Sequence, residues 1–300
     1  MANRRKRNRI ALTRSDHIFN AINYLFLSLV FLVTIYPAYY VLVASISNST
    51  FVNSGELLLW PKGLHFTGYQ HVLSDPRIGT GYMNIVIYTI GGTALGLFPS
   101  LLAGYSLSRN DLPGRKIITA FMVFTMYFSG GLIPTYLVVK SLGLLNSRGI
   151  VVILGSVSVY NIILIRTFFA SNIPPDLREA AEIDECGNTR FFFSVVLPLS
   201  KAIISVIGLC LAVGYWNSYF NALIYLTDRS KHPLQIFLRE ILLTQTQNDI
   251  ADGKMASAYK KMVAVIKYAV IVISTLPIMC LYPFLQKYFV QGVMIGSLKG

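Results

Sequence analysis

The apolar residues of this chain fall in long, nearly uninterrupted runs that are separated by short polar connections. A run of about 20 apolar residues, folded as an α-helix, spans the hydrocarbon core of a bilayer. A soluble domain built from strands would instead show turn residues roughly every ten positions. The pattern therefore predicts an all-α membrane protein with six transmembrane helices, at residues 18–44, 82–108, 117–139, 149–170, 201–225 and 262–285.

The connections between the runs divide the chain into three parts. A basic N-terminal segment covers residues 1–17, the six-span domain covers 18–290, and a tail covers 291–300. Within the six-span domain, we distinguish a cytoplasmic connection at 171–200 and an outer loop at 226–261. Two outer segments, at about 45–81 and 227–259, are large enough to hold structure of their own. The composition agrees with a membrane protein, because 54% of the residues are hydrophobic and only 13% are charged, against about 25% charged in soluble domains.

The net charge of +13 is compatible with nucleic-acid binding, but the positions of the basic residues argue against it. Lys and Arg mostly flank the apolar runs, as they do at membrane boundaries. The dense basic run Arg4–Arg9 indicates a cytoplasmic N-terminus against anionic lipid. Arg109, Arg115 and Lys116 then fall on the same side, as does the C-terminus. Six basic residues between the fifth and sixth spans argue for the opposite orientation, but the first flank usually dominates.

All thirteen Asp and Glu residues lie outside the predicted spans. Ion-coupled carriers usually need an acidic side chain within the membrane, so this chain has no evident site for a coupling ion. It also lacks a G-x-x-x-x-G-K-[ST] phosphate-binding loop. The three Cys and four His show no metal-ligand spacing. A transporter with these properties either needs a partner that hydrolyses nucleotide or is a passive channel.

Five of the acidic residues cluster in the connection at 171–200. Ser171 or Asn172 can cap a helix there, and the two following prolines suit its first turn. We expect that helix to break near Gly187, a second short helix to carry Phe191–Phe193, and Leu197-Pro198 to turn the chain into the fifth span. Leu177, Ala180, Ala181 and Asp184 share a face of the first helix. The alternative is a solvated amphipathic loop helix without a partner.

The same segment resembles the EAA loop of ABC importer permeases. The resemblance rests on Glu179-Ala180-Ala181-x-x-Asp184, on Phe192 and on Leu197-Pro198-Leu199, placed before the penultimate span. The whole chain is similar to sugar permeases of the maltose and oligosaccharide systems, second-permease type. Supporting segments are 103–109, Trp216-Asn217 and the tail 292–300. One departure is Glu185, where the family usually has glycine, and this suggests a turn shifted toward Gly187.

The resemblance implies a type I importer architecture in which the EAA loop forms a coupling helix that docks on an ATPase subunit. The residues implied in coupling are Glu179, Ala180, Ala181, Asp184, Glu185, Gly187, Phe192, Pro198 and Lys299. It further implies a bacterial multi-pass membrane protein without enzymatic activity, cofactor or metal of its own. Its partners would be a homologous permease, two ATP-binding subunits that hold ATP and Mg²⁺, and an extracellular solute-binding protein.

Polar and aromatic residues in the fourth and fifth spans are the candidates for the substrate pathway, because aromatic rings stack on sugars and amides bond to hydroxyls. They are Tyr160, Asn161, Tyr215, Trp216, Asn217, Tyr219 and Asn221. The alternative for these residues is helix packing or an interfacial aromatic belt. Gly92-x-x-x-Gly96 is typical of close helix packing. The apolar face of residues 234–242 predicts either an interfacial helix on lipid or a docking surface for an external partner.

Three other function classes stay open on the sequence alone. The chain could be an ABC permease for a non-sugar solute, although the absence of membrane carboxylates disfavours cationic polyamines. It could be an ion-coupled carrier or a passive channel, which ATP depletion would distinguish. A membrane enzyme has the least support, because no H-E-x-x-H motif or pair of membrane aspartates is present. The identity of the sugar does not follow from the sequence.

Overall fold

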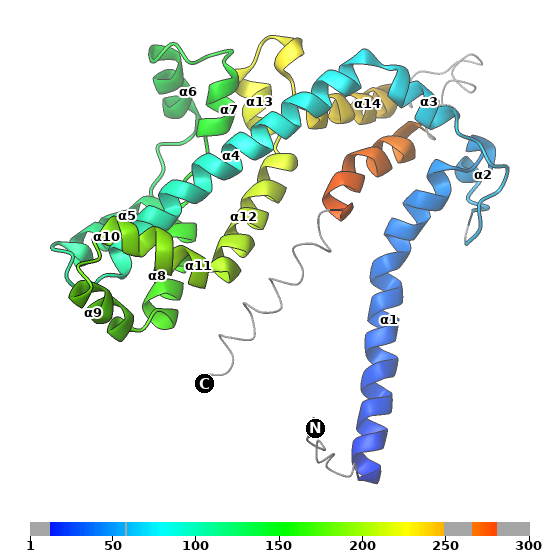
Figure 1. The fold of residues 1–300 in the computed structure, drawn as a ribbon. Helices are drawn as coiled ribbons and strands as arrows, with labels where there is room; N and C mark the ends of the chain where they lie inside the picture. Colours follow the sequence, from blue (N-terminus) through cyan, green and yellow to red (C-terminus); the bar gives the residue numbers. More distant parts are fainter. Residues whose placement is uncertain (1–12, 58, 249–265, 281–300) are drawn as a thin grey trace. The chain divides into compact units, whose positions relative to one another are not determined.

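Helices make up the regular structure of the part of the chain described by the computed structural model, which covers residues 13–57, 59–248 and 266–280 (Figure 1). These residues contain no strand. The elements before the connection at 171–200 are α1 (Arg14–Ser45), α2 (Ser49–Asn53), α3 (Thr67–Ser74), α4 (Pro76–Ser108), α5 (Arg115–Tyr127), α6 (Leu132–Ser141), α7 (Arg148–Ile153) and α8 (Val159–Asn172). The later elements are α9 (Pro175–Ile183), α10 (Asn188–Phe191), the π-helix η1 (Phe192–Val196), α11 (Leu197–Leu199), α12 (Lys201–Trp216), α13 (Phe220–Tyr225), the 3₁₀ turn η2 (Arg229–Lys231), α14 (Leu234–Asn248) and a helix at Ile266–Cys280.

Residues 1–70 and 253–272 form one compact part of the chain. Its long helix α1 begins with a capping box, in which Thr13 and Asp16 exchange hydrogen bonds between side chain and backbone. Most of the apolar side chains of α1 are exposed, as expected for a helix that faces lipid. A small core closes its C-terminal end and includes Val43, Ala44 and Leu57.

The second compact part, residues 71–252 and 273–300, is built around α4. Helices α7, α8, α12 and α14 all pack against α4, which runs through the middle of this part (Figure 1). Three glycines make the close approaches possible. A Cβ added at Gly92 would lie 2.2 Å from the ring of Tyr215, and one at Gly96 would lie 2.3 Å from the carbonyl oxygen of Ser156. A Cβ added at Gly104 would lie 2.5 Å from the side chain of Ile165. The prediction of close packing at Gly92 and Gly96 is confirmed.

Three predicted spans are not single helices. Within residues 117–139, α5 and α6 are bent by 110° across a short break that contains Gly131, whose φ is +83°. Within 149–170, α7 and α8 are separated by a turn at Gly155, with φ +81°. Within 201–225, α12 ends at Trp216 and α13 begins at Phe220. Glycine adopts positive φ at little cost, so it allows chain reversals that a continuous apolar pattern does not reveal.

Two helices, α1 and α4, are long and apolar enough to cross a membrane, and up to four spans result if each bent pair counts as one. The bent pairs are α5 with α6, and residues 188–199 with α12. The helix Ile266–Cys280 is apolar but shorter, and the remainder of the predicted span 262–285 lies outside the described residues. The all-α membrane fold is therefore confirmed, whereas the six-helix count remains a prediction.

Helix α14 corrects the interpretation of the amphipathic stretch at 234–242. Leu234, Ile236, Phe237 and Leu238 are buried, and α14 packs on α4, where Gly81 lies against the backbone of Leu234. The apolar face is therefore covered by the protein itself. Both interpretations, a lipid-facing helix and a docking surface, are wrong for Leu234, Phe237 and Leu238 of the predicted face, because the protein itself already buries them.

Candidate functional site

The connection at 171–200 folds as a helix–turn–helix. Helix α9 begins with Pro175 at its first position, where the missing N–H costs no intrahelical bond. The expected cap from Ser171 or Asn172 is wrong, since both residues belong to the last turn of α8. Their side chains donate to the carbonyls of Thr167 (3.0 Å) and Phe168 (3.0 Å). Helix α9 therefore starts from a proline-defined corner without a side-chain cap.

The turn that ends α9 is built on Glu185. This residue has φ +51°, a left-handed conformation that is costly for a side chain with Cβ. The N–H of Cys186 donates to the carbonyl of Ala181 (2.8 Å), and that of Glu185 donates to Glu182 (3.1 Å). This pair of bonds is the Schellman arrangement. Gly187 has φ −62° and precedes α10. The turn is therefore not shifted toward Gly187, because Glu185 adopts the conformation that a glycine would take.

The two faces of α9 differ in their surroundings. Glu179, Ala180 and Ile183 are exposed, with 83% of Ile183 open to solvent. Ala181 is half-buried and packs with Cys186 against the apolar cluster formed by α4, α8 and η1. The exposed face is therefore Glu179, Ala180 and Ile183, and Ala181 instead holds α9 against the rest of the chain.

The other residues expected in coupling differ in exposure and in the element that carries them. Asp184 and Glu185 are exposed at the turn. Phe192 is buried in the core, with its ring 5.1 Å from that of Tyr105, and so it supports the site from within. Pro198 lies in α11, just before the 81° bend into α12. Lys299 lies outside the described residues.

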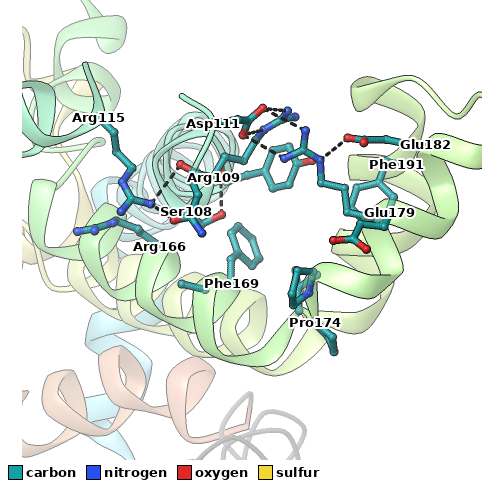
Figure 2. Close-up of a pocket in the computed structure, with 16 residues that line it drawn as sticks. Ser108, Arg109, Asp111, Arg115, Arg166, Phe169, Pro174, Glu179, Glu182 and Phe191 are labelled. Carbon is teal, nitrogen blue, oxygen red and sulfur yellow. Dashed lines mark hydrogen bonds and ion pairs between the residues drawn. The ribbon is translucent and has the colours of Figure 1, made fainter. Parts of the chain in front are cut away.

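A network of ion pairs joins α9 to the end of α4 (Figure 2). Arg178 donates to both carboxylate oxygens of Asp111, at 3.0 and 3.1 Å, and to Glu182 at 2.8 Å. Arg109 also donates to Asp111 and reaches Asn188 at the start of α10. Hydrogen bonds from Arg109 and then Arg178 hold the pKa of Asp111 well below its usual range. Asp111 therefore stays ionised and links α9 to the end of α4, while Arg109 makes the contact with α10.

Sequence reasoning missed Asp111 and Arg178. The available signal was the single acidic residue in the otherwise basic segment Arg109–Lys116. An isolated carboxylate in a basic loop is a candidate for a bridge between cations, but its second partner lies 67 residues away in the sequence.

A pocket of about 640 Å³ lies beside this network. It is formed by the C-terminal end of α4, the start of α5, the end of α8 and the first turns of α9 (Figure 2). Phe169, Ile173 and Pro174 supply apolar lining. The charged residues around the pocket are Arg109, Asp111, Arg115, Arg166, Arg178, Glu179 and Glu182.

The substrate-pathway candidates divide into two groups. Tyr215 and Trp216 are buried, and their polar atoms donate to the carbonyls of Val152 (2.7 Å) and Ser274 (2.9 Å). These two residues act as helix-packing groups, the alternative considered for them. Asn217 is exposed and donates to Val213 within α12, and the ring of Tyr219 faces the guanidinium of Arg239 at 4.8 Å. The remaining candidates are the exposed Tyr160 and the half-buried Asn161 and Asn221.

Comparison with known proteins places these features in a family context. Residues 92–295 match the family model described as "Binding-protein-dependent transport system inner membrane component". The chain is 40% identical to the Bacillus subtilis polygalacturonan/rhamnogalacturonan transport system permease protein YtcP, over 95% of this chain and 99% of that protein. It is 38% identical to B. subtilis protein LplC, over 96% and 97%. A crystal structure of a bacterial ABC transporter that imports the acidic polysaccharide alginate contains a similar chain, with TM-score 0.82, 32% identity, and coverage of 94% and 100%.

Proposed function

Because this chain belongs to the family of binding-protein-dependent transport system inner membrane components, we propose that it is the permease subunit of an ATP-driven importer that takes up an oligosaccharide. Relatives named for polygalacturonan/rhamnogalacturonan, diacetylchitobiose and melibiose/raffinose/stachyose uptake support a saccharide substrate. The chain would form the translocation path with a homologous permease. Two ATP-binding subunits would hydrolyse ATP with Mg²⁺, and an extracellular binding protein would deliver the sugar. The permease itself would catalyse no reaction.

The single observation that carries this proposal is the exposed face of α9, a helix that ion pairs and apolar contacts join to the rest of the chain. Glu179, Ala180 and Ile183 offer a carboxylate, a close-contact position and an apolar side chain to a partner. Other residues of α9, Arg178 and Ala181, hold it to the end of α4 and to the cluster around η1. A push on the exposed face would therefore move the ends of α4 and α8 together. The side that carries α9 would face the cytoplasm, as would both termini.

The proposed contact of Glu179 is with a basic group on the ATPase. We expect Glu179→Lys to separate ATP hydrolysis from uptake, because reversing one charge of an interfacial pair costs several kcal/mol. Vesicles reconstituted with the complete importer should show uptake reduced by at least about tenfold. Membrane insertion and ATPase turnover should remain measurable.

Glu56→Lys is the matched control, since Glu56 is also exposed but pairs with Lys62 in the other compact part of the chain. This control should transport normally. Full transport by Glu179→Lys would contradict the proposed coupling role.

A panel of saccharides, each offered with the binding protein and scored by ATPase stimulation, tests the substrate class. Stimulation by a non-saccharide solute alone would contradict the sugar assignment.

A further inference from the structure

Two arginines in the pocket beside α9 have no acidic partner among the described residues. Arg115 donates through one terminal nitrogen to the carbonyl of Arg109 (3.2 Å) and to the side chain of Asn110 (2.7 Å). Arg166 donates through Nε to the carbonyl of Leu107 (3.2 Å). Within the described ranges, neither guanidinium has a carboxylate oxygen within 4.0 Å. Both therefore keep charge and several N–H donors for another ligand.

The acceptors of these two arginines fix their positions. Leu107 and Arg109 lie at the end of α4, so both guanidiniums are held by the last turn of one helix. Carbonyls at a helix C-terminus attract cations. The side chains are thus preorganised, and a ligand would not need to order them, which lowers the entropic cost of binding.

Apart from Glu179, the other charges of the pocket are already paired. Asp111 is shared by Arg109 and Arg178, and Glu182 accepts from Arg178. Figure 2 shows Arg115 and Arg166 at the end of the pocket away from Glu179. That end therefore has an excess of positive charge without a carboxylate to neutralise it.

We propose that Arg115 and Arg166 bind the phosphate group of an anionic phospholipid headgroup. Guanidinium groups match phosphate oxygens through paired, charge-assisted hydrogen bonds. Helix α5 starts at Arg115 and exposes Ile117 (77%) and Phe121 (68%), which are side chains suited to acyl chains. The arginines therefore lie where an apolar membrane-facing surface begins, which is the depth of the headgroups.

The shape and lining of the pocket support a lipid over a small free anion. Its volume of about 640 Å³ exceeds the need of one phosphate. Phe169, Ile173 and Pro174 supply apolar walls that a glycerol backbone can contact. Because the pocket also contains α9 residues Arg178 and Glu179, an occupied site would brace the coupling helix against α4.

The test measures lipid binding to the purified complete importer by native mass spectrometry, so its outcome does not depend on which solute is transported. Dioleoyl phosphatidylglycerol and dioleoyl phosphatidylcholine are titrated in parallel. We expect Arg115→Gln with Arg166→Gln to weaken phosphatidylglycerol binding at least about tenfold, as expected for the loss of charge-assisted bonds. Phosphatidylcholine has the same phosphate but also a quaternary ammonium that the arginines repel, so it should bind more weakly and its binding should fall less in these variants. The single variants are measured as well, so the comparison holds even if the double variant assembles poorly.

Lys116→Gln is the matched control, because Lys116 is exposed, adjacent in sequence and absent from the pocket lining. It should change binding by no more than about twofold. An equal loss in Lys116→Gln, or unchanged phosphatidylglycerol binding in the arginine variants, overturns the proposal. Displacement of the lipid by equimolar inorganic phosphate would assign the site to a free anion instead. Loss of ATPase subunits without loss of lipid would assign the arginines to a protein carboxylate.

Discussion

The two ends of α4 are attached to the rest of the chain in different ways. Near its N-terminal end, Asn84 donates to the carbonyls of Ser230 (2.8 Å) and His232 (3.0 Å), and Tyr88 donates to that of Lys231 (2.7 Å). Asn84 and Tyr88 are each only 1% exposed. At the C-terminal end, the links between α4 and α9 are ion pairs through Asp111, whose side chain is 50% exposed.

This difference separates a fixed end from an adjustable end. A buried neutral hydrogen bond is costly to break, because water cannot replace the lost partner. A solvent-exposed ion pair contributes little stability, because water solvates both charges when it opens. The N-terminal end therefore holds α4 in one geometry. The ion pairs that join α9 to the C-terminal end can open at small cost, although the apolar cluster around Leu101 and Phe169 stays buried.

The largest effect on stability is expected from Asn84→Ala. The substitution leaves the buried carbonyl of His232 and the part-buried carbonyl of Ser230 without their donor, and it should lower the free energy of unfolding by about 1–3 kcal/mol. Thermal unfolding of the purified importer measures it. Asn217→Ala is the control for stability, since Asn217 is exposed and bonds only within its own helix. Equal destabilisation by Asn84→Ala and Asn217→Ala would contradict the claim that the buried hydrogen bonds of Asn84 fix the N-terminal end of α4.

A smaller effect of opposite sign is expected from Glu185→Gly. Glycine accepts the φ of +51° without steric strain, so α9 should gain about 0.5–1 kcal/mol at its turn. The amide of Cys186 donates to the carbonyl of Ala181 at this turn. We therefore expect this amide to exchange its hydrogen more slowly in Glu185→Gly. Glu182→Gly lies within α9 and should instead destabilise it by about 1 kcal/mol. Faster exchange in Glu185→Gly would contradict the strain at this position.

Asp111→Asn tests the adjustable end. Unfolding of the importer should change by about 1 kcal/mol or less, because the ion pairs are exposed. The uptake per ATP hydrolysed should fall by a larger factor than the stability changes, because α9 loses its charged link to α4. The ratio of uptake to hydrolysis in reconstituted vesicles measures the effect. A loss of stability as large as that of Asn84→Ala would show that both ends of α4 are fixed.

The smallest effect concerns pH. The pKa of Asp111 is lowered by hydrogen bonds from Arg109 and Arg178. A lowered carboxyl pKa contributes stability that is fully present above its unfolded value near 4 and is lost as pH falls through the folded value. Between about pH 5 and 8 the network should therefore stay unchanged. A chemical-shift titration of the Asp111 carboxyl with a midpoint inside that window would contradict the assigned pairing.

Local features of the connection at 171–200 could be predicted because they depend on nearby residues. The prolines define the start of α9, and the short helices follow from their own composition. The position of the turn was mispredicted, because Glu185 adopts a glycine-like conformation that the Schellman bonds stabilise. Periodicity placed Ala181 on a face of α9 but did not say that this side chain meets the apolar cluster, where it is half-buried.

The sequence by itself determined that this chain is a helical membrane protein and that residues 171–200 hold a short acidic helix that begins at a proline, because apolar runs and short motifs are local properties. Only the tertiary structure decided that Asp111 pairs with Arg178, that Tyr215 and Trp216 are packing groups, and that α14 is covered by α4. Each of these depends on residues far apart in the chain. Their contacts follow from how the helices pack around the glycines of α4, which periodicity alone does not specify.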